Sequence, residues 1–142
     1  MKDLSGQTII VTGGGKGIGR GITTAFAKAG AHVAICGRSE PEAFDSEIAD
    51  HIHFIELDIR EAENAETLID FAASFGHPIT TLINNAGGGP PVASAEASPS
   101  LTEKVIKLNL LAPIYLSQAA YNYMRANDVN GSIINISSVS AT

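Results

Sequence analysis

The sequence predicts an α/β domain whose parallel sheet is covered by helices on both faces, a doubly wound, three-layer arrangement. Two observations lead to this fold class. Short runs of β-branched and apolar residues alternate with stretches whose apolar residues recur at helical spacing. In addition, 14 glycines and an aromatic content of only 6% suit sheets that pack closely against helices. No repeat, low-complexity segment or linker interrupts the pattern, so residues 1–142 are expected to form one domain.

The first half of the chain predicts three strands with two helices between them. Apolar runs place the strands at 7–13, 31–37 and 51–58. The first helix is expected over 18–29, where isoleucine, alanine and phenylalanine share one face. A second, short helix is expected at 40–50, in the stretch EPEAFDSEIAD.

The second half continues the alternation. A helix is expected over 61–76 and a strand over 78–87. A loop rich in Gly, Pro, Ala and Ser occupies 88–100 and leads into a long helix at 101–127. After an Asn-Gly turn, the branched residues of 132–137 predict the fifth strand.

Composition and charge argue against several classes of protein. The net charge of −6 and the lack of a Lys or Arg cluster argue against nucleic-acid binding. The chain has no apolar run of about 18 residues or more, so no membrane span is expected. Its N-terminus reaches glycine-rich sequence too early for a signal peptide. The single cysteine, Cys36, cannot form an internal disulfide, and a soluble cytoplasmic protein is therefore expected.

A glycine-rich stretch, VTGGGKGIGRG at 11–21, connects the first strand to the first helix. In folds of this class the pyrophosphate of a dinucleotide binds at this connection. Glycines are needed because a Cβ atom would hold the phosphates away from the backbone N–H groups, and the helix N-terminus favours an anion. Taken alone, the stretch is also consistent with a tight turn that has only a structural role.

Further motifs in a fixed order favour the dinucleotide. They are Thr12-Gly13-x-x-x-Gly17-x-Gly19, Asp58 in LDIR, NNAG at 84–87, Asn109 in KLNLLAP, and GSIINISS at 131–138. With these motifs the sequence resembles the short-chain dehydrogenase/reductase family. The resemblance implies a Rossmann-like sheet with strand order 3-2-1-4-5, any later strands lying outside this sequence. It also implies these cofactor-binding residues: Thr12, Gly13, Gly15, Lys16, Gly17, Ile18, Gly19, Arg38, Asp58, Ile59, Asn85, Ala86 and Gly87.

The residue after the second strand indicates the type of nicotinamide cofactor. NAD-dependent enzymes usually have an acidic residue there, which binds the ribose 2′-hydroxyl. Here Gly37 holds that position and Arg38 follows it, while Lys16 lies in the glycine-rich stretch. Because both cations would pair with a 2′-phosphate, we expect NADP(H) rather than NAD(H). The alternative is that Arg38 is an ordinary solvated loop residue.

The resemblance also implies an oxidoreductase that transfers hydride between NADP(H) and a small carbonyl or alcohol substrate. Ser138 corresponds to the serine that polarises the carbonyl, and Asn109 to the helix asparagine that holds a proton-relay water. The family's Tyr-x-x-x-Lys pair is expected about a dozen residues after Ser138, and the sequence ends four residues after it. Tyr121-x-x-x-Arg125 lies on the wrong element, and arginine cannot replace the lysine. We therefore expect the N-terminal part of a longer reductase, inactive by itself.

The remaining expectations concern assembly, metals and an alternative function. The resemblance implies that the helix at 101–127 contacts a second subunit in a homo-oligomer. The four histidines are scattered in the sequence, and His51 and His53 have no third ligand nearby, so no metal site is expected. The main alternative to the reductase is a nucleotide-binding module without dehydrogenase activity, which would act as a sensor or an assembly partner.

Overall fold

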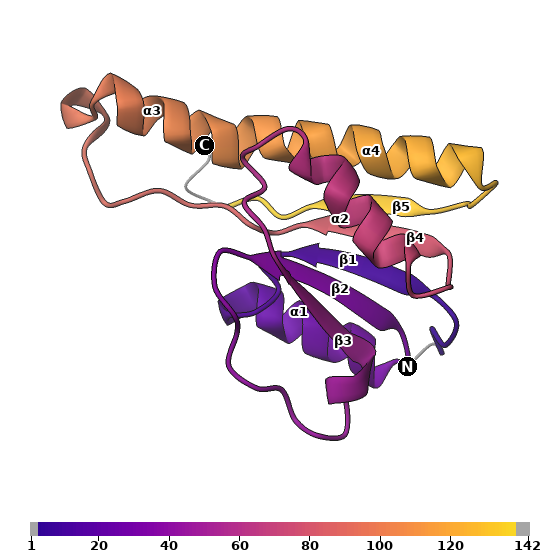
Figure 1. Ribbon diagram of the computed structural model, residues 1–142. Coiled ribbons are helices and arrows are strands. Elements are labelled where there is room, and N and C mark those ends of the chain that lie inside the picture. The colour runs from indigo at the N-terminus through magenta and orange to yellow at the C-terminus, as the bar shows by residue number, and fades with distance from the viewer. Residues whose placement is uncertain (1–2, 139–142) are drawn as a thin grey trace.

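The computed structural model describes residues 3–138 and shows a five-stranded parallel sheet between two layers of helices (Figure 1). The strand order, β3-β2-β1-β4-β5, confirms the predicted doubly wound arrangement. The strands are β1 (Thr8–Thr12), β2 (His32–Gly37), β3 (Ile52–Glu56), β4 (Ile79–Asn84) and β5 (Ser132–Asn135). The α-helices are α1 (Gly17–Lys28), α2 (Asn64–Ala73), α3 (Pro99–Ile106) and α4 (Ala112–Ala126).

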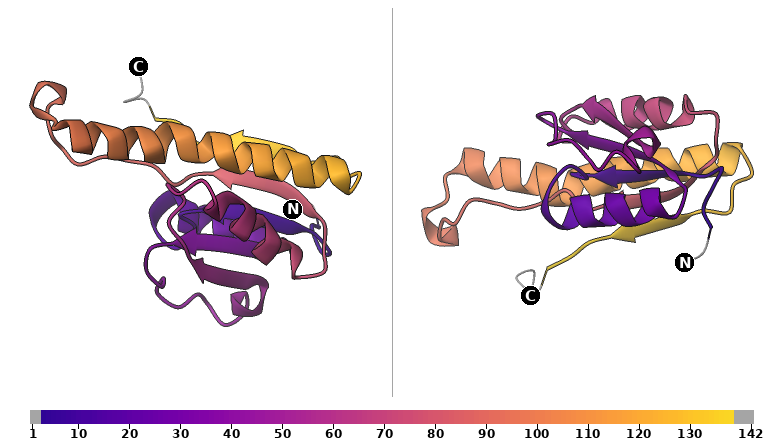
Figure 2. Two further views of the ribbon diagram at one scale, coloured as in Figure 1. Left: turned by 45° about the horizontal axis from the view of Figure 1, so that its top comes forward. Right: turned by 90° about the horizontal axis from the view of Figure 1, so that it is seen from below.

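The two faces of the sheet carry separate cores. Ile9 and Val11 of β1 are buried on the face covered by α1. The intervening Ile10 points to the opposite face and is buried with Leu68 of α2 and Leu116 of α4. Figure 2 shows α1 on one side of the sheet and α2 with α4 on the other. Because β1 lies at the centre with both faces covered, all five of its residues are buried.

The predicted helix at 101–127 is a continuous helical rod whose middle turn is wider than an α-turn. α3 begins after Ser98, whose hydroxyl accepts a hydrogen bond of 3.2 Å from the Leu101 N–H. A π-helical segment, Lys107–Leu111, then joins α3 to α4. Pro113 has no N–H to donate to the preceding turn, which favours the wider, π-helical geometry there. No helix within residues 3–138 combines the length and apolar character needed to cross a bilayer.

The predicted helix at 40–50 is wrong. The segment is a loop that ends in a single 3₁₀ turn, Ala49–His51. The Arg20 guanidinium, on α1, donates hydrogen bonds to the carbonyl oxygens of Glu42 (2.8 Å) and Ala43 (2.6 Å). It also lies 3.9 Å from the centre of the Phe44 ring. These tertiary contacts take the backbone carbonyls that helical hydrogen bonds would need, so they override the local helix propensity.

One face of β5 is left uncovered. Ile134 pairs with Ile83 of β4, so both side chains point to the α1 face of the sheet. Ile83 is buried there, whereas Ile134 is 43% exposed and Ile136, two residues further on, is 41% exposed. In Figure 1, β5 lies at the edge of the sheet, apart from α1. Within the described part of the chain, no element packs on this face of β5.

Candidate functional site

A cleft of about 1010 Å³ opens where the carboxyl ends of the strands meet the loops that follow them. It lies between the loops after β1 and β4, where the strand order reverses direction. In open parallel sheets this is the position at which ligands bind. Of the 13 predicted cofactor-binding residues, the structure brings 12 to its wall: Gly13, Gly15, Lys16, Gly17, Ile18, Gly19, Arg38, Asp58, Ile59, Asn85, Ala86 and Gly87. Their contact with a cofactor remains a prediction.

The glycine-rich turn forms the floor of this cleft because side chains cannot be accommodated in it. Gly13 has a φ of 64°, in the left-handed region that favours glycine. A Cβ atom on Gly19 would overlap the carbonyl oxygen of Gly13. The first turn of α1 has no side-chain cap, so its backbone N–H groups are available to an anion in the cleft.

Thr12, the remaining predicted contact, lies beneath the cleft and not on its wall. It is buried, and its hydroxyl accepts hydrogen bonds from the N–H groups of Asn85 (3.1 Å) and Ala86 (3.0 Å). In return, the Asn85 side-chain amide donates to the Thr12 carbonyl oxygen at 3.0 Å. This reciprocal contact fixes the turn after β1 to the turn after β4. Thr12 therefore positions the residues that line the cleft.

Arg20 also shapes the cleft, although the sequence analysis did not single it out. Its contacts with Glu42, Ala43 and Phe44 hold the loop after β2 against the glycine-rich turn. The loop approaches so closely that a Cβ atom on Gly15 would lie 2.8 Å from Pro41. No sequence signal identifies Arg20, because its partners are backbone carbonyls more than twenty residues later in the chain.

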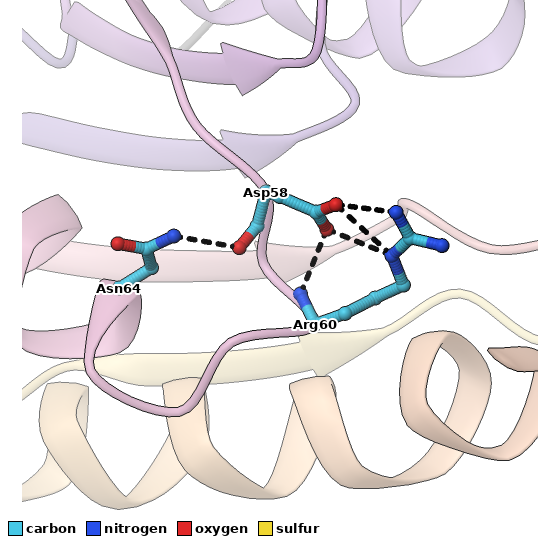
Figure 3. Close-up of polar contacts among 3 residues, drawn as sticks. All are labelled: Asp58, Arg60 and Asn64. Carbon is cyan, nitrogen blue, oxygen red and sulfur yellow. Dashed lines mark hydrogen bonds and ion pairs between the residues drawn. The ribbon is translucent and has the colours of Figure 1, made fainter. Parts of the chain in front are cut away.

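The loop after β3 carries a cluster of polar contacts around Asp58 (Figure 3). The Arg60 side chain folds back onto the Asp58 carboxylate, and the Asn64 amide donates to the Asp58 carbonyl oxygen at 2.8 Å. Hydrogen bonds from Arg60 lower the pKa of Asp58, and the charge of nearby Arg38 lowers it slightly further. Asp58 is thus an anion at the cleft wall, and Arg60 holds its carboxylate in place.

The charge lining the cleft differs in sign from that of the whole chain. The chain carries −6, but basic side chains outnumber acidic ones at the cleft wall. The basic side chains are Lys16, Arg20, Arg38 and Arg60, and the acidic ones are Glu40, Glu42 and Asp58. A net positive cleft in an acidic protein attracts an anionic ligand.

Asn109, a predicted catalytic residue, lies in the π-helical segment and is exposed. Its side-chain amide exchanges two hydrogen bonds of 2.8 Å with the backbone of Gly88, and it also donates to the Val105 carbonyl oxygen at 2.9 Å. The amide therefore holds the loop after β4 against the helix.

Ser138, the other predicted catalytic residue, follows β5 at the same edge of the sheet, and its side chain is exposed. The strand pairing continues to Ile136, whose N–H donates to the Asn84 carbonyl oxygen at 2.9 Å. Ser138 and Asn109 are not among the residues that line the cleft. Tyr121 and Arg125 are exposed on α4 and are also not among the residues that line the cleft.

Cys36 lies at the cleft wall but is buried, whereas the histidines are not among the residues that line the cleft. Burial raises the pKa of the Cys36 thiol to about 12, which agrees with its interpretation as a small buried apolar residue. The sequence positions of the histidines suggested that they are scattered, but in the structure they lie together. His32 lies at the centre of a cluster, with ring centroids 4.8–5.5 Å from those of His51, His53 and His77. In the described residues, however, no three His, Cys, Asp or Glu side chains are arranged to hold a metal ion.

Comparisons with known proteins agree on one family. A family model described as short chain dehydrogenase matches residues 7–142. Glucose 1-dehydrogenase 2 from Bacillus subtilis (strain 168) is 32% identical over 145 residues, with 97% of this chain and 56% of the relative covered. L-fucose dehydrogenase from Bos taurus is 36% identical over 139 residues, with 95% and 50% covered. The solved structure of ElxO with NADP bound has a TM-score of 0.82 at 30% identity and covers 99% of this chain and 57% of its own. The chain spans about half the length of the curated relatives it matches.

Proposed function

The chain belongs to the short chain dehydrogenase family, and on that basis we propose that it forms the cofactor-binding part of an NADP(H)-dependent oxidoreductase. Its substrate would be a small carbonyl compound or alcohol. The observation that carries this proposal is the positively charged cleft at the switch point of the sheet, with the uncapped N-terminus of α1 in its wall. The bound nicotinamide would supply the hydride chemistry, and this chain's residues would bind and orient it.

Arg38 supports NADP(H) over NAD(H). It follows the last residue of β2, lies exposed at the cleft wall, and would donate charge-assisted hydrogen bonds to a 2′-phosphate. The Arg38→Ser substitution should weaken NADPH binding about 10-fold or more, the value of a hydrogen bond to a charged group, and leave NADH binding nearly unchanged. Fluorescence titration of both nucleotides measures this, with Arg125→Ser on α4 as the matched control. Equal affinity of the unaltered chain for both nucleotides would contradict the preference.

We propose that Ser138 polarises the substrate carbonyl and that Asn109 helps to hold the proton-relay water. The sequence has no Tyr followed four residues later by Lys, so the chain by itself has no proton donor of the family's kind. Loss of a positioned proton donor costs on the order of 10²–10⁴-fold in rate. We therefore expect negligible NADPH oxidation by the 142-residue chain with a panel of ketones. Robust turnover by a preparation of confirmed mass would refute this.

The second candidate function is a nucleotide-binding module without dehydrogenase activity. The observation that favours it is that Ser138 and Asn109 are not among the residues that line the cleft. The intact mass of the native protein, together with its reading frame, distinguishes the two candidates. A Tyr-x-x-x-Lys shortly after residue 142 would decide for the reductase, and a stop codon at that point would decide for the module.

From the single buried thiol we propose a location in the cytoplasm. We further propose that the protein forms a homo-oligomer through the outer face of α3 and α4. Large apolar side chains are exposed along this rod at spacings of four, four and seven: Ile106, Leu110, Ile114 and Tyr121. The Tyr121→Glu substitution should shift the chain toward monomer in sedimentation velocity, because it places a charge in the contact. Ala25→Glu, exposed on α1 at the opposite face of the sheet, is the control. An unchanged distribution for Tyr121→Glu would argue against this interface.

A further inference from the structure

We propose that Arg20 is a positioning residue for the cofactor preference, because it holds the loop after β2 in the place where Arg38 faces the 2′-phosphate of NADP(H). This inference rests on the proposed function, since it assumes that a dinucleotide occupies the cleft and that Arg38 binds its 2′-phosphate. It adds that the preference depends on a residue of α1, which acts through Arg38 and does not bind the phosphate itself.

The first argument is that the loop after β2 has little regular structure to hold it in place. Residues 38–45 form no helix or strand, and within the described residues no backbone group of 39–44 is hydrogen-bonded to another backbone group. The loop also carries charges of both signs, since Arg38, Glu40 and Glu42 are all exposed at the cleft wall. A loop that moved freely would bring its carboxylates as well as the guanidinium toward a bound phosphate, and like charges repel. A preference for the 2′-phosphate therefore requires that the loop is fixed.

The second argument is that the Arg20 guanidinium supplies the missing contacts. Its Nη1 donates to the Glu42 carbonyl oxygen at 2.8 Å and its Nη2 to the Ala43 carbonyl oxygen at 2.6 Å, so one planar group holds two successive residues of the loop. Nη1 also lies 3.4 Å from the carbonyl oxygen of Gly15, in the glycine-rich turn that carries Lys16. Arg20 therefore joins the two segments that bear the cations expected at the 2′-phosphate.

The third argument is that these contacts leave Arg20 poorly placed to bind a phosphate directly. Both of its terminal nitrogens donate to carbonyl oxygens, and its guanidinium carbon lies 3.9 Å from the centre of the Phe44 ring, within range of cation–π attraction. The Arg38 side chain, in contrast, is exposed and makes no hydrogen bond or ion pair to the described residues. Phe44 packs against the core on the α1 face and is not among the residues that line the cleft. A change at Phe44 can therefore affect a bound phosphate only through the position of the loop.

The experiment measures the cofactor preference of the 142-residue chain, which is the NADH dissociation constant divided by the NADPH dissociation constant, by fluorescence titration. Arg20→Met keeps a long side chain but removes the donors, and it should lower the preference about 3- to 10-fold, because Arg38 must then be ordered during binding. Phe44→Leu removes the ring but leaves every charge in place, and it should lower the preference in the same direction. Phe26→Leu is the matched control and should leave the preference unchanged, because its ring packs on the same core but is not the one beneath Arg20.

A double-mutant cycle tests whether Arg20 acts through Arg38. In the Arg38→Ser background, Arg20→Met should change the preference by less than about twofold, because the contact that the loop positions is already absent.

A second measurement needs no nucleotide. A glutamate-specific protease should cut the Glu42–Ala43 bond several-fold faster in Arg20→Met than in the unaltered chain, because the two carbonyl contacts at that bond are lost. Mass spectrometry identifies the cleaved bond, and circular dichroism checks that every variant is folded.

The possible outcomes discriminate between this inference and the function on which it rests. An effect of Arg20→Met that is equally large with and without Arg38 would overturn the inference, because Arg20 would then bind the phosphate itself. Equal weakening of both nucleotides, an unchanged preference in Phe44→Leu, or an unchanged rate of cleavage would also overturn it while dinucleotide binding stands. If the unaltered chain binds neither nucleotide, or binds both equally, the proposed cofactor preference fails and the inference fails with it. Faster cleavage of Arg20→Met would in that case still show that Arg20 fixes the loop.

Discussion

Replacing Gly19 by alanine should abolish measurable NADPH binding and lower the free energy of unfolding by about 2 kcal/mol. The added Cβ atom would overlap the carbonyl oxygen of Gly13 and would lie 2.5 Å from the side-chain nitrogen of Asn85. Neither atom can move easily, because Thr12 and Asn85 bind the two turns to each other. The turn would have to open, and the backbone N–H groups proposed to bind the pyrophosphate would move away from it.

Gly21→Ala is the matched control, in the same helix only two residues away. A Cβ atom at Gly21 meets no heavy atom within 4 Å, and its φ is not positive. This variant should gain up to about 1 kcal/mol of stability, because alanine is the better helix former. Urea unfolding followed by circular dichroism measures both changes, and nucleotide titration measures binding. If Gly19→Ala were as stable as Gly21→Ala and bound NADPH, the described packing of the turn would be incorrect.

The second large effect is a loss of stability as the pH falls from about 7.5 to 5.5. Burial lowers the pKa of His32, and the neighbouring His77 and His51 lower it further. Burial, His32 and His51 lower the pKa of His53 in the same way. An unfolded histidine has a pKa of about 6.5, so the unfolded chain binds protons more readily than the folded chain below that pH. Protonation therefore favours unfolding, and stability is lost as the pH decreases through this range.

The melting temperature measured across this range tests the prediction. We expect it to be constant above about pH 7.5 and to fall by a few degrees by pH 5.5. All four histidines of the sequence belong to the cluster, so no isolated histidine contributes to the curve. Asp58, whose pKa is also lowered, acts only below about pH 4 and does not overlap. His53→Gln should flatten the dependence, and equal slopes for both proteins would exclude the cluster as its cause.

The order of strands and helices could be predicted because each of these elements has its own local periodicity of apolar residues. The glycine-rich turn also marks the connection between the first strand and the first helix. The loop at 40–50 could not, because its conformation is set by Arg20, about twenty residues earlier. Similarly, the widened turn around Asn109 depends on how Pro113 and Gly88 meet the helix. Helix propensity alone contains no information about these partners.

The histidine cluster shows a different limit of the sequence analysis. His32 and His53 lie at or near the starts of β2 and β3, and His51 and His77 lie one or two residues before a strand. Parallel strands begin at the same edge of the sheet, so the histidines at their starts lie close together at the amino edge. In the same way, the cleft residues lie together at the carboxyl edge, where the strands end.

The amide hydrogens of β5 should exchange with solvent faster than those of β1. β1 is paired on both sides and buried throughout, whereas β5 pairs with β4 alone in residues 3–138 and three of its four residues are exposed. Local opening of β5 therefore needs less free energy than opening of the centre of the sheet. The glycine-rich turn follows β1 and Ser138 follows β5. The proposed cofactor site is thus attached to a protected strand at the centre of the sheet, and the proposed reactive serine to an edge strand that opens more easily.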